Sequence, residues 1–281
     1  MTLAAGMKFN WGILLCADTE MAYGGVQKVR GEKLFAFHLS ARKLKIGFAI
    51  AGSVPDAKVA IRKIMNAIED ADASVALTPR AVLEATEQSL AKIHNERVYP
   101  HPNFQRDGSP EFWLVIAFAI DSDPPHLYVT YEDRVTPIDK FESIGSGDYL
   151  FRYVFGPGYD SLLNEEEAII LATHALRETK STVPGVGFGS EFRIYSERKH
   201  DFSTIGGYDI SHVEDFSAEF KRAMYDLLFN YANLTVGDGT LEEARTQFIN
   251  NLTSLRKEYL KDKVSMVQLK ALLHILHPRV K

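Results

Sequence analysis

Residues 1–20 read MTLAAGMKFNWGILLCADTE, in which two apolar runs are separated by a turn-like Asn10-Trp11-Gly12. Two more strand-like segments follow at 31–37 and 46–53, after a glycine-containing loop. Short apolar runs bounded by Gly, Asn and charged residues are typical of strands joined by tight turns. We therefore predict the order strand, hairpin turn, strand, loop, strand, turn and strand for this part of the chain.

The residue after the initiator methionine is Thr2, which lies at the start of the first predicted strand. Methionine before a small residue is usually trimmed, so we expect the mature chain to begin with Thr2. A terminal threonine carries a nucleophile, its hydroxyl, and a potential base, its own α-amine, on one residue. The reference pKa of an α-amine is about 7.7–8.0, so a useful fraction is uncharged near neutral pH. Thr2 is therefore the candidate nucleophile.

Three further residues suit the chemistry of a terminal threonine. A cation near the α-amine would lower its pKa and favour the base form, and Lys33 could be that cation with Asp18 as its counter-charge. Backbone N–H groups just before a predicted helix could bind a developing oxyanion, and Gly52 is the candidate donor. An ordinary surface ion pair between Asp18 and Lys33 is the alternative that this pattern leaves open.

These residues carry a resemblance to the β-type subunits of the 20S proteasome and their bacterial relatives, which are N-terminal-nucleophile (Ntn) hydrolases. Asp18 lies sixteen residues after Thr2, as the acid of that family does. The run 31–35 (GEKLF) resembles the strand of the catalytic lysine, and 49–57 (AIAGSVPDA) resembles the glycine turn before the first helix. Lys33 falls one residue short of the family spacing, which one deletion in the preceding loop would explain.

The resemblance implies an α+β fold, namely the Ntn-hydrolase αββα four-layer sandwich of two antiparallel sheets flanked by helices. It covers roughly residues 2–210. We therefore predict a proteasome-like Ntn-hydrolase domain over 1–210 and a helical C-terminal extension over 211–281. Three segments of this extension have a helical apolar pattern or a helix-capping signature: 217–231, 240–261 and 264–276.

The resemblance also implies a substrate pocket and a supporting residue. Side chains at the pocket positions of the family match Met21, Ile50 and Val54, which are apolar and imply a preference for an apolar residue before the scissile bond. A Gly-Ser-Gly-Ser stretch of the family supports the nucleophile through its last serine. Asp148 stands at that place here, and we predict the same supporting role for it.

One part of the family pattern is missing from this sequence. Active proteasome subunits carry an aspartate and a serine in a glycine-rich loop that supports the terminal threonine. The corresponding loop here is 184–190 (PGVGFGS), and Val183 and Val186 stand at the two supporting places. This departure favours a non-catalytic subunit over an active enzyme.

Composition and motifs exclude several other classes of protein. The formal net charge of −5 gives no electrostatic reason to expect nucleic acid as a partner. Cys16 is the only cysteine and lies in an apolar run, so we predict a buried thiol. No apolar run is long enough to cross a membrane and no secretory signal is evident, so we expect a cytoplasmic protein. No spacing of His and Cys indicates a metal, and we expect no cofactor.

The sequence thus predicts a proteasome-like threonine peptidase that cleaves amide bonds. Thr2 would be the nucleophile, Lys33 would tune the pKa of its amine, Asp18 would orient Lys33, and Gly52 would bind the oxyanion. The expected partners are further copies of this chain in a homo-oligomeric ring, peptide or unfolded-protein substrates, and an ATPase unfoldase. Two alternatives stay open, a non-catalytic ring or scaffold subunit and an Ntn amidase that acts on a small amide.

Overall fold

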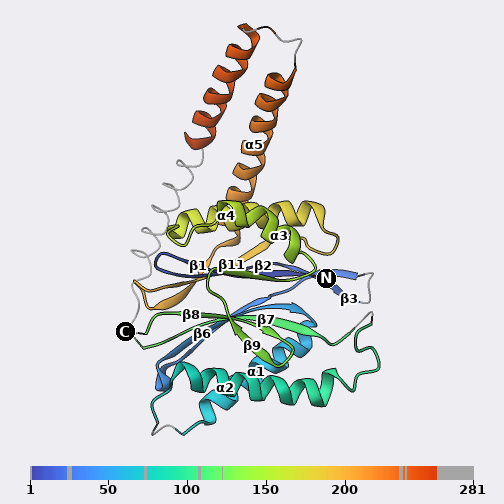
Figure 1. Cartoon of the computed structure of the whole chain (residues 1–281), viewed down its shortest axis with the longest axis vertical. Coiled ribbons are helices and arrows are strands. Elements are labelled where there is room, and N and C mark those ends of the chain that lie inside the picture. Colours follow the sequence, from blue (N-terminus) through green and yellow to red (C-terminus); the bar gives the residue numbers. More distant parts are fainter. Residues whose placement is uncertain are drawn as a thin grey trace, which may run out of the picture. The chain divides into compact units, whose positions relative to one another are not determined.

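The structure is a computed structural model that contains both helices and sheets (Figure 1). The chain divides into two compact units, Met1–Ile210 and Ser211–Lys281. In the first unit, the described strands form two five-stranded sheets and one two-stranded ribbon, and all paired strands are antiparallel. The structure describes residues 2–23, 27–72, 75–106, 109–121, 123–233, 237 and 239–257.

The first sheet has its N-terminal strand in an inner position. Its strand order is β10-β1-β2-β11-β12, so β1 lies between β2 and β10. Leu3 pairs with Gly145, and Asp18 pairs with Ser190. This register brings three distant parts of the sequence to one end of the sheet. The strands are β1 (Leu3–Phe9), β2 (Gly12–Asp18), β10 (Phe141–Gly145), β11 (Ser190–Ser196) and β12 (Asp201–Ile205).

The second sheet is a meander whose spatial order follows the sequence, β5-β6-β7-β8-β9. Its long central pair β6 and β7 is buried along most of its length, as expected for strands covered on both faces. The strands are β5 (Leu34–Leu39), β6 (Leu44–Gly52), β7 (Phe112–Ile120), β8 (His126–Tyr131) and β9 (Arg134–Pro137).

Three apolar clusters connect the layers of this unit. One cluster joins the second sheet to α1 (Val54–Asp70) and α2 (Pro79–Ile93). Another joins the first sheet to α3 (Asp148–Phe155) and α4 (Glu165–Thr182). The third lies between the two sheets and is rich in alanine. Figure 1 shows the two sheets facing one another, with one pair of helices outside each.

Short helical turns complete the first unit. Two are 3₁₀ turns, which follow a strand and a helix, and the third is a π-helical turn that extends α2. They lie at Ser40–Arg42, Gly156–Gly158 and His94–Val98.

Several sequence predictions are confirmed here. The strand–turn–strand pattern of the N-terminus appears as β1 and β2, and Cys16 is fully buried. Side-chain caps also begin two of the helices: Thr78 caps α2 by accepting the N–H of Ala81, and Asn164 begins α4 with a capping box. Ser53 occupies the N-cap position of α1 but makes no cap hydrogen bond, because its hydroxyl donates to Asp56 instead.

One prediction of a loop was wrong. The expected loop after Asp18 contains a two-stranded ribbon, β3 (Glu20–Tyr23) paired with β4 (Gln27–Arg30). The segment from Arg134 to Gly145 also forms two strands, β9 and β10, which belong to different sheets. The sequence could not show the split, because an apolar run looks the same whether or not the chain crosses between layers.

The second unit is described only in part. α5 (Gly207–Ala232) crosses the boundary between the units, and a further helix spans 239–257. The predicted helical segment 264–276, and the end of the one predicted over 240–261, lie outside the described residues. Among the residues that the structure describes, no helix is long and apolar enough to cross a membrane.

Gly6 provides a test of the close approach of the two sheets. A Cβ at Gly6 on β1 would lie 2.5 Å from Cγ1 of Val115 on β7. We expect Gly6→Ala to lower the free energy of unfolding by about 1–3 kcal/mol through overpacking. Gly207→Ala is the matched control, since no atom lies within 4 Å of the added methyl group, and it should leave stability unchanged or slightly raised. Equal effects in urea unfolding would contradict this account.

Candidate active site

Thr2 is buried at the start of β1, where the backbone of β10 approaches it closely. Gly145 has a positive φ of 98°, and a Cβ there would lie 2.3 Å from the carbonyl oxygen of Thr2. Only glycine suits both this conformation and this approach. The end of β10 therefore holds the backbone of Thr2 in place.

Asp18, at the end of β2, is completely buried and is held by three backbone N–H groups. Its Oδ1 accepts a hydrogen bond from the N–H of Leu3 at 2.8 Å. Its Oδ2 accepts from the N–H groups of Glu20 and Gly187, both at 3.0 Å. A buried charge needs such partners, and these three fix the direction in which the carboxylate points.

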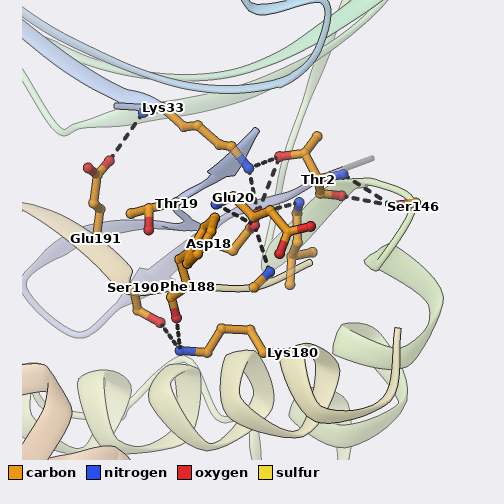
Figure 2. A network of polar contacts seen from close by, with 12 residues as sticks. Thr2, Asp18, Thr19, Glu20, Lys33, Ser146, Lys180, Phe188, Ser190 and Glu191 are labelled. Carbon is orange, nitrogen blue, oxygen red and sulfur yellow. Dashed lines mark hydrogen bonds and ion pairs between the residues drawn. The ribbon is translucent and has the colours of Figure 1, made fainter. Parts of the chain in front are cut away.

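Lys33 joins Asp18 and Thr2 into one cluster (Figure 2). Its Nζ donates to Oδ1 of Asp18 at 2.7 Å and also to the hydroxyl oxygen of Thr2. The Thr2 hydroxyl in turn lies 3.2 Å from Oδ1 of Asp18. Lys33 and Asp18 are 1% and 0% exposed as side chains, so the alternative of an ordinary surface ion pair does not describe them. The structure thus brings together three of the four residues predicted to be catalytic.

The environment of Lys33 acts on its pKa in two opposing directions. Burial lowers the pKa of the ammonium, and this is the larger effect. The charges of Asp18, Glu191 and Glu20 act in the raising direction. Glu191 also accepts the backbone N–H of Lys33 at 3.2 Å, and burial raises the pKa of the Glu191 carboxyl.

The Ser146 side chain, to which the sequence pattern assigned no role, also contacts the backbone of Thr2. The Thr2 N–H donates to Oγ of Ser146 at 3.1 Å, and Oγ lies 3.3 Å from the carbonyl oxygen of Thr2. Asp148, to which we assigned this support, instead accepts the N–H of Tyr149 and pairs with Arg152 on α3. Ser146 stands between two glycines of the same stretch. The Gly-Ser-Gly pattern therefore marked the correct segment, but we assigned the supporting role to the residue two positions after Ser146.

The loop after α4 also takes part in the cluster. Gly187 contributes its N–H to Asp18, and the next glycine, Gly189, exchanges hydrogen bonds with Thr19. Lys180 on α4 donates to the carbonyl of Phe188 at 3.2 Å, and Phe188 has a positive φ of 56°. Val183 and Val186, which stand where the family carries an aspartate and a serine, belong to the apolar cluster around α4. The loop therefore supports Asp18 through its backbone rather than through acidic or hydroxyl side chains.

The remaining predicted site residues lie near the start of α1 or on the ribbon. Gly52 ends β6 with a positive φ of 87°, and a Cβ there would lie 2.4 Å from the carbonyl oxygen of Glu111. Ile50 has no exposed surface and belongs to the core beneath α1. Val54 and Met21 are partly exposed. Of the three predicted pocket residues, only Val54 and Met21 present surface to a substrate in this conformation.

A double-mutant cycle tests the burial of the ion pair. We expect Asp18→Ala and Lys33→Met each to lower the free energy of unfolding by about 3–5 kcal/mol, because each leaves a buried group without its partner. The double variant should lose less than the sum of the two. The exposed pair of Lys43 and Asp121 is the control, with an expected coupling below about 1 kcal/mol. Additive losses at the buried pair would contradict the strong coupling.

Comparison with known proteins agrees with this architecture. Residues 2–194 match the Proteasome subunit family. The Proteasome subunit beta of Methanocorpusculum labreanum is 26% identical over 211 residues, which cover 74% of this chain and 92% of that protein. Proteasome subunit beta type-2 of Saccharomyces cerevisiae is 27% identical over 178 residues, 63% of this chain and 61% of that protein.

Solved structures of bacterial Anbu proteins share the fold. A Gly-1 mutant of Anbu from Hyphomicrobium sp. strain MC1 superposes with a TM-score of 0.66 at 14% identity and covers 80% of this chain and 96% of its own. Anbu (ancestral beta-subunit) from Yersinia bercovieri has a TM-score of 0.66 at 13% identity, with 79% and 95% covered. Since the family match extends over more than two thirds of the chain, this protein belongs to the proteasome subunit family.

Proposed function

We propose that this chain is a threonine-type peptidase with Thr2 as its nucleophile, built on the αββα four-layer sandwich of Ntn hydrolases. One observation carries the proposal. The Thr2 hydroxyl oxygen accepts a hydrogen bond from Lys33 and lies beside the Asp18 carboxylate, in a buried cluster. A hydroxyl in such surroundings, on a residue with a free α-amine, has what it needs to attack an amide carbonyl.

The reaction begins with removal of Met1, which frees the α-amine of Thr2. The amine accepts the hydroxyl proton, directly or through one water, while Oγ forms a bond to the carbonyl carbon of the substrate. The resulting oxyanion is bound by the N–H of Gly52. The protonated amine then gives its proton to the leaving nitrogen as the carbon–nitrogen bond breaks. A water molecule hydrolyses the ester that remains on Thr2 by the same steps.

Three side chains support Thr2 through their charge or their position. The Lys33 ammonium lowers the pKa of the Thr2 amine and stabilises negative charge on Oγ. Asp18 holds the ammonium in place at 2.7 Å, and Ser146 orients the Thr2 nitrogen at 3.1 Å.

Met21 and Val54, with Ile50 beneath, contribute an apolar pocket, so we propose a preference for an apolar residue before the scissile bond.

A non-catalytic ring or scaffold subunit is the second candidate, because apolar Val183 and Val186 replace the family's supporting side chains in the loop after α4. An amidase that acts on small amides would use the same cluster with a different pocket. Reaction of Thr2 with a specific probe separates the non-catalytic subunit from the peptidase and the amidase, and turnover of peptides separates the peptidase from the amidase.

Self-association is part of the proposal. A solved neighbour at 15% identity with a TM-score of 0.64 is the helical assembly of the Anbu complex from Pseudomonas aeruginosa. Membership of a ring-forming family supports further copies of this chain as partners, in a ring or a related assembly. We propose unfolded protein as the substrate, a cytoplasmic location, and an ATPase unfoldase as the partner that delivers it.

Intact mass spectrometry tests the nucleophile. The purified protein should lack the mass of one methionine and should gain one adduct from a peptide epoxyketone, which reacts with both the amine and the hydroxyl of a terminal threonine. Thr2→Ala should lose the adduct while keeping the fold. Retained Met1, or a trimmed chain that never gains the adduct, would leave the non-catalytic subunit as the better reading.

The pH dependence of this labelling tests the role of Lys33. In the proposed mechanism, labelling of Thr2 requires Lys33 in its ammonium form. This charged form is lost as the pH rises through the pKa of the buried side chain. Since burial lowers that pKa, the labelling rate should fall on the alkaline side below the usual lysine range near 10.4. Lys33→Met should lower the rate across the whole range. A rate that stays constant to above this range would show that the charge of Lys33 is not used.

A further inference from the structure

Glu20 is a buried carboxylate to which the proposed reaction assigns no role. It begins β3 and is 5% exposed, although glutamate is almost never buried unless it is paired. Its Oε1 forms an ion pair with Nζ of Lys28 on β4 at 2.8 Å, but no hydrogen bond of good geometry. Lys28 is 57% exposed, so a mobile cation at the surface compensates this carboxylate only in part.

The backbone around Asp18 fixes where the Glu20 carboxylate lies. The N–H of Glu20 donates to Oδ2 of Asp18, as does the N–H of Gly187. A Cβ at Gly187 would lie 2.4 Å from Oε2 of Glu20, so the carboxylate rests directly on this glycine. Any other residue at 187 would push the carboxylate away. Figure 2 shows Glu20 in the same cluster as Thr2 and Asp18.

Negatively charged side chains on three different strands act on Lys33. Asp18 on β2 contacts its Nζ directly, Glu191 on β11 accepts its backbone N–H, and the charge of Glu20 on β3 also acts on the ammonium. Beyond these groups lie Lys28 next to Glu20, and the ion pair of Glu32 with Arg193 at 3.4 Å. Arg30 of β4 lies near Gly189.

We propose that Glu20 is a charge-setting residue of the Thr2 site. Its carboxylate, which packs against Gly187, offsets the positive charges of Lys33 and of the free amine of Thr2. It supplies from β3 the negative charge that the loop after α4, with Val183 and Val186, does not supply. Glu20 acts through Lys33 and the amine, so it is a positioning residue and not a catalytic one. The proposal rests on the proposed function, in which both groups must hold the right protonation state.

The sign of the effect follows from the charges. A carboxylate near a cationic group favours its charged form, so Glu20→Gln should lower the pKa of both Lys33 and the Thr2 amine. The whole pH profile of labelling should therefore move to lower pH, by about half a unit or more. Lys28→Gln removes the cation that compensates Glu20, so the profile should move to higher pH. A purely structural role for Glu20 would lower the rate without moving the profile.

The experiment measures labelling by the peptide epoxyketone against pH for the full chain and its variants. Glu32→Gln is the matched control, because this carboxylate neighbours Lys33 in sequence but is 52% exposed and paired with Arg193. It should leave the profile in place. Opposite shifts for Glu20→Gln and Lys28→Gln support the proposal. Unmoved profiles, or shifts in the same direction, would overturn it.

A second readout separates this proposal from the proposed function. NMR titration of the Lys33 Nζ in protein with isotope-labelled lysine reports its pKa whether or not Thr2 reacts. If the unaltered chain does not label but Glu20→Gln still lowers this pKa, the peptidase proposal fails and the charge-setting role stands. If the chain labels and the Lys33 pKa is the same in all variants, the charge-setting role fails. Lys28 is exposed, so its variant remains informative even if Glu20→Gln does not fold.

Discussion

The buried ion pair between Lys33 and Asp18 is the constraint on which the site depends. Removing both charges from water carries a large desolvation cost, and their attraction offsets it only when further hydrogen bonds satisfy the carboxylate. Backbone N–H groups from the starts of β1 and β3 and from the loop after α4 provide these bonds. Each of those segments is therefore fixed by the same carboxylate that orients the lysine towards Thr2.

The rest of the fold brings these segments to one place. The hairpin of β1 and β2 sets Thr2 close to Asp18, and the second sheet brings Lys33 to the same end. Small residues between the sheets, including Gly6 and Gly47, let the two layers approach closely. Lys33 can therefore contact Asp18 of the other sheet. The contact of Lys33 with Thr2 therefore depends on the packing between the sheets, which sets the distance between the layers.

The loop after α4 has apolar side chains next to the Thr2 cluster, and a carboxylate of the ribbon lies beside this loop. The resembled family carries acidic and hydroxyl side chains in that loop, whereas here Val186 is buried and the backbone N–H of Gly187 contacts Asp18. Lys180 holds the loop from α4, and Glu20 rests on it from β3. A carboxylate on the ribbon therefore lies where side-chain support from the loop is lacking.

Much of the fold was determined by local sequence patterns. Apolar runs between turn residues predicted the N-terminal strands, and side-chain caps begin α2 and α4, because both kinds of signal depend on neighbouring residues alone. The meeting of Thr2, Asp18 and Lys33 was predicted from spacing and from family resemblance. Spacing in the Gly-Ser-Gly stretch misled us to Asp148, because which residue faces Thr2 depends on the turn between β10 and α3.

Only the tertiary structure decided the surroundings of this cluster. The sequence does not reveal that 135–141 passes from one sheet to the other, or that the loop after Asp18 pairs with itself as β3 and β4. Nor does it show that Glu20 is buried against Gly187, residues separated by most of the first unit. Contacts between distant segments depend on how the layers pack, and that packing is a property of the whole chain rather than of any local pattern.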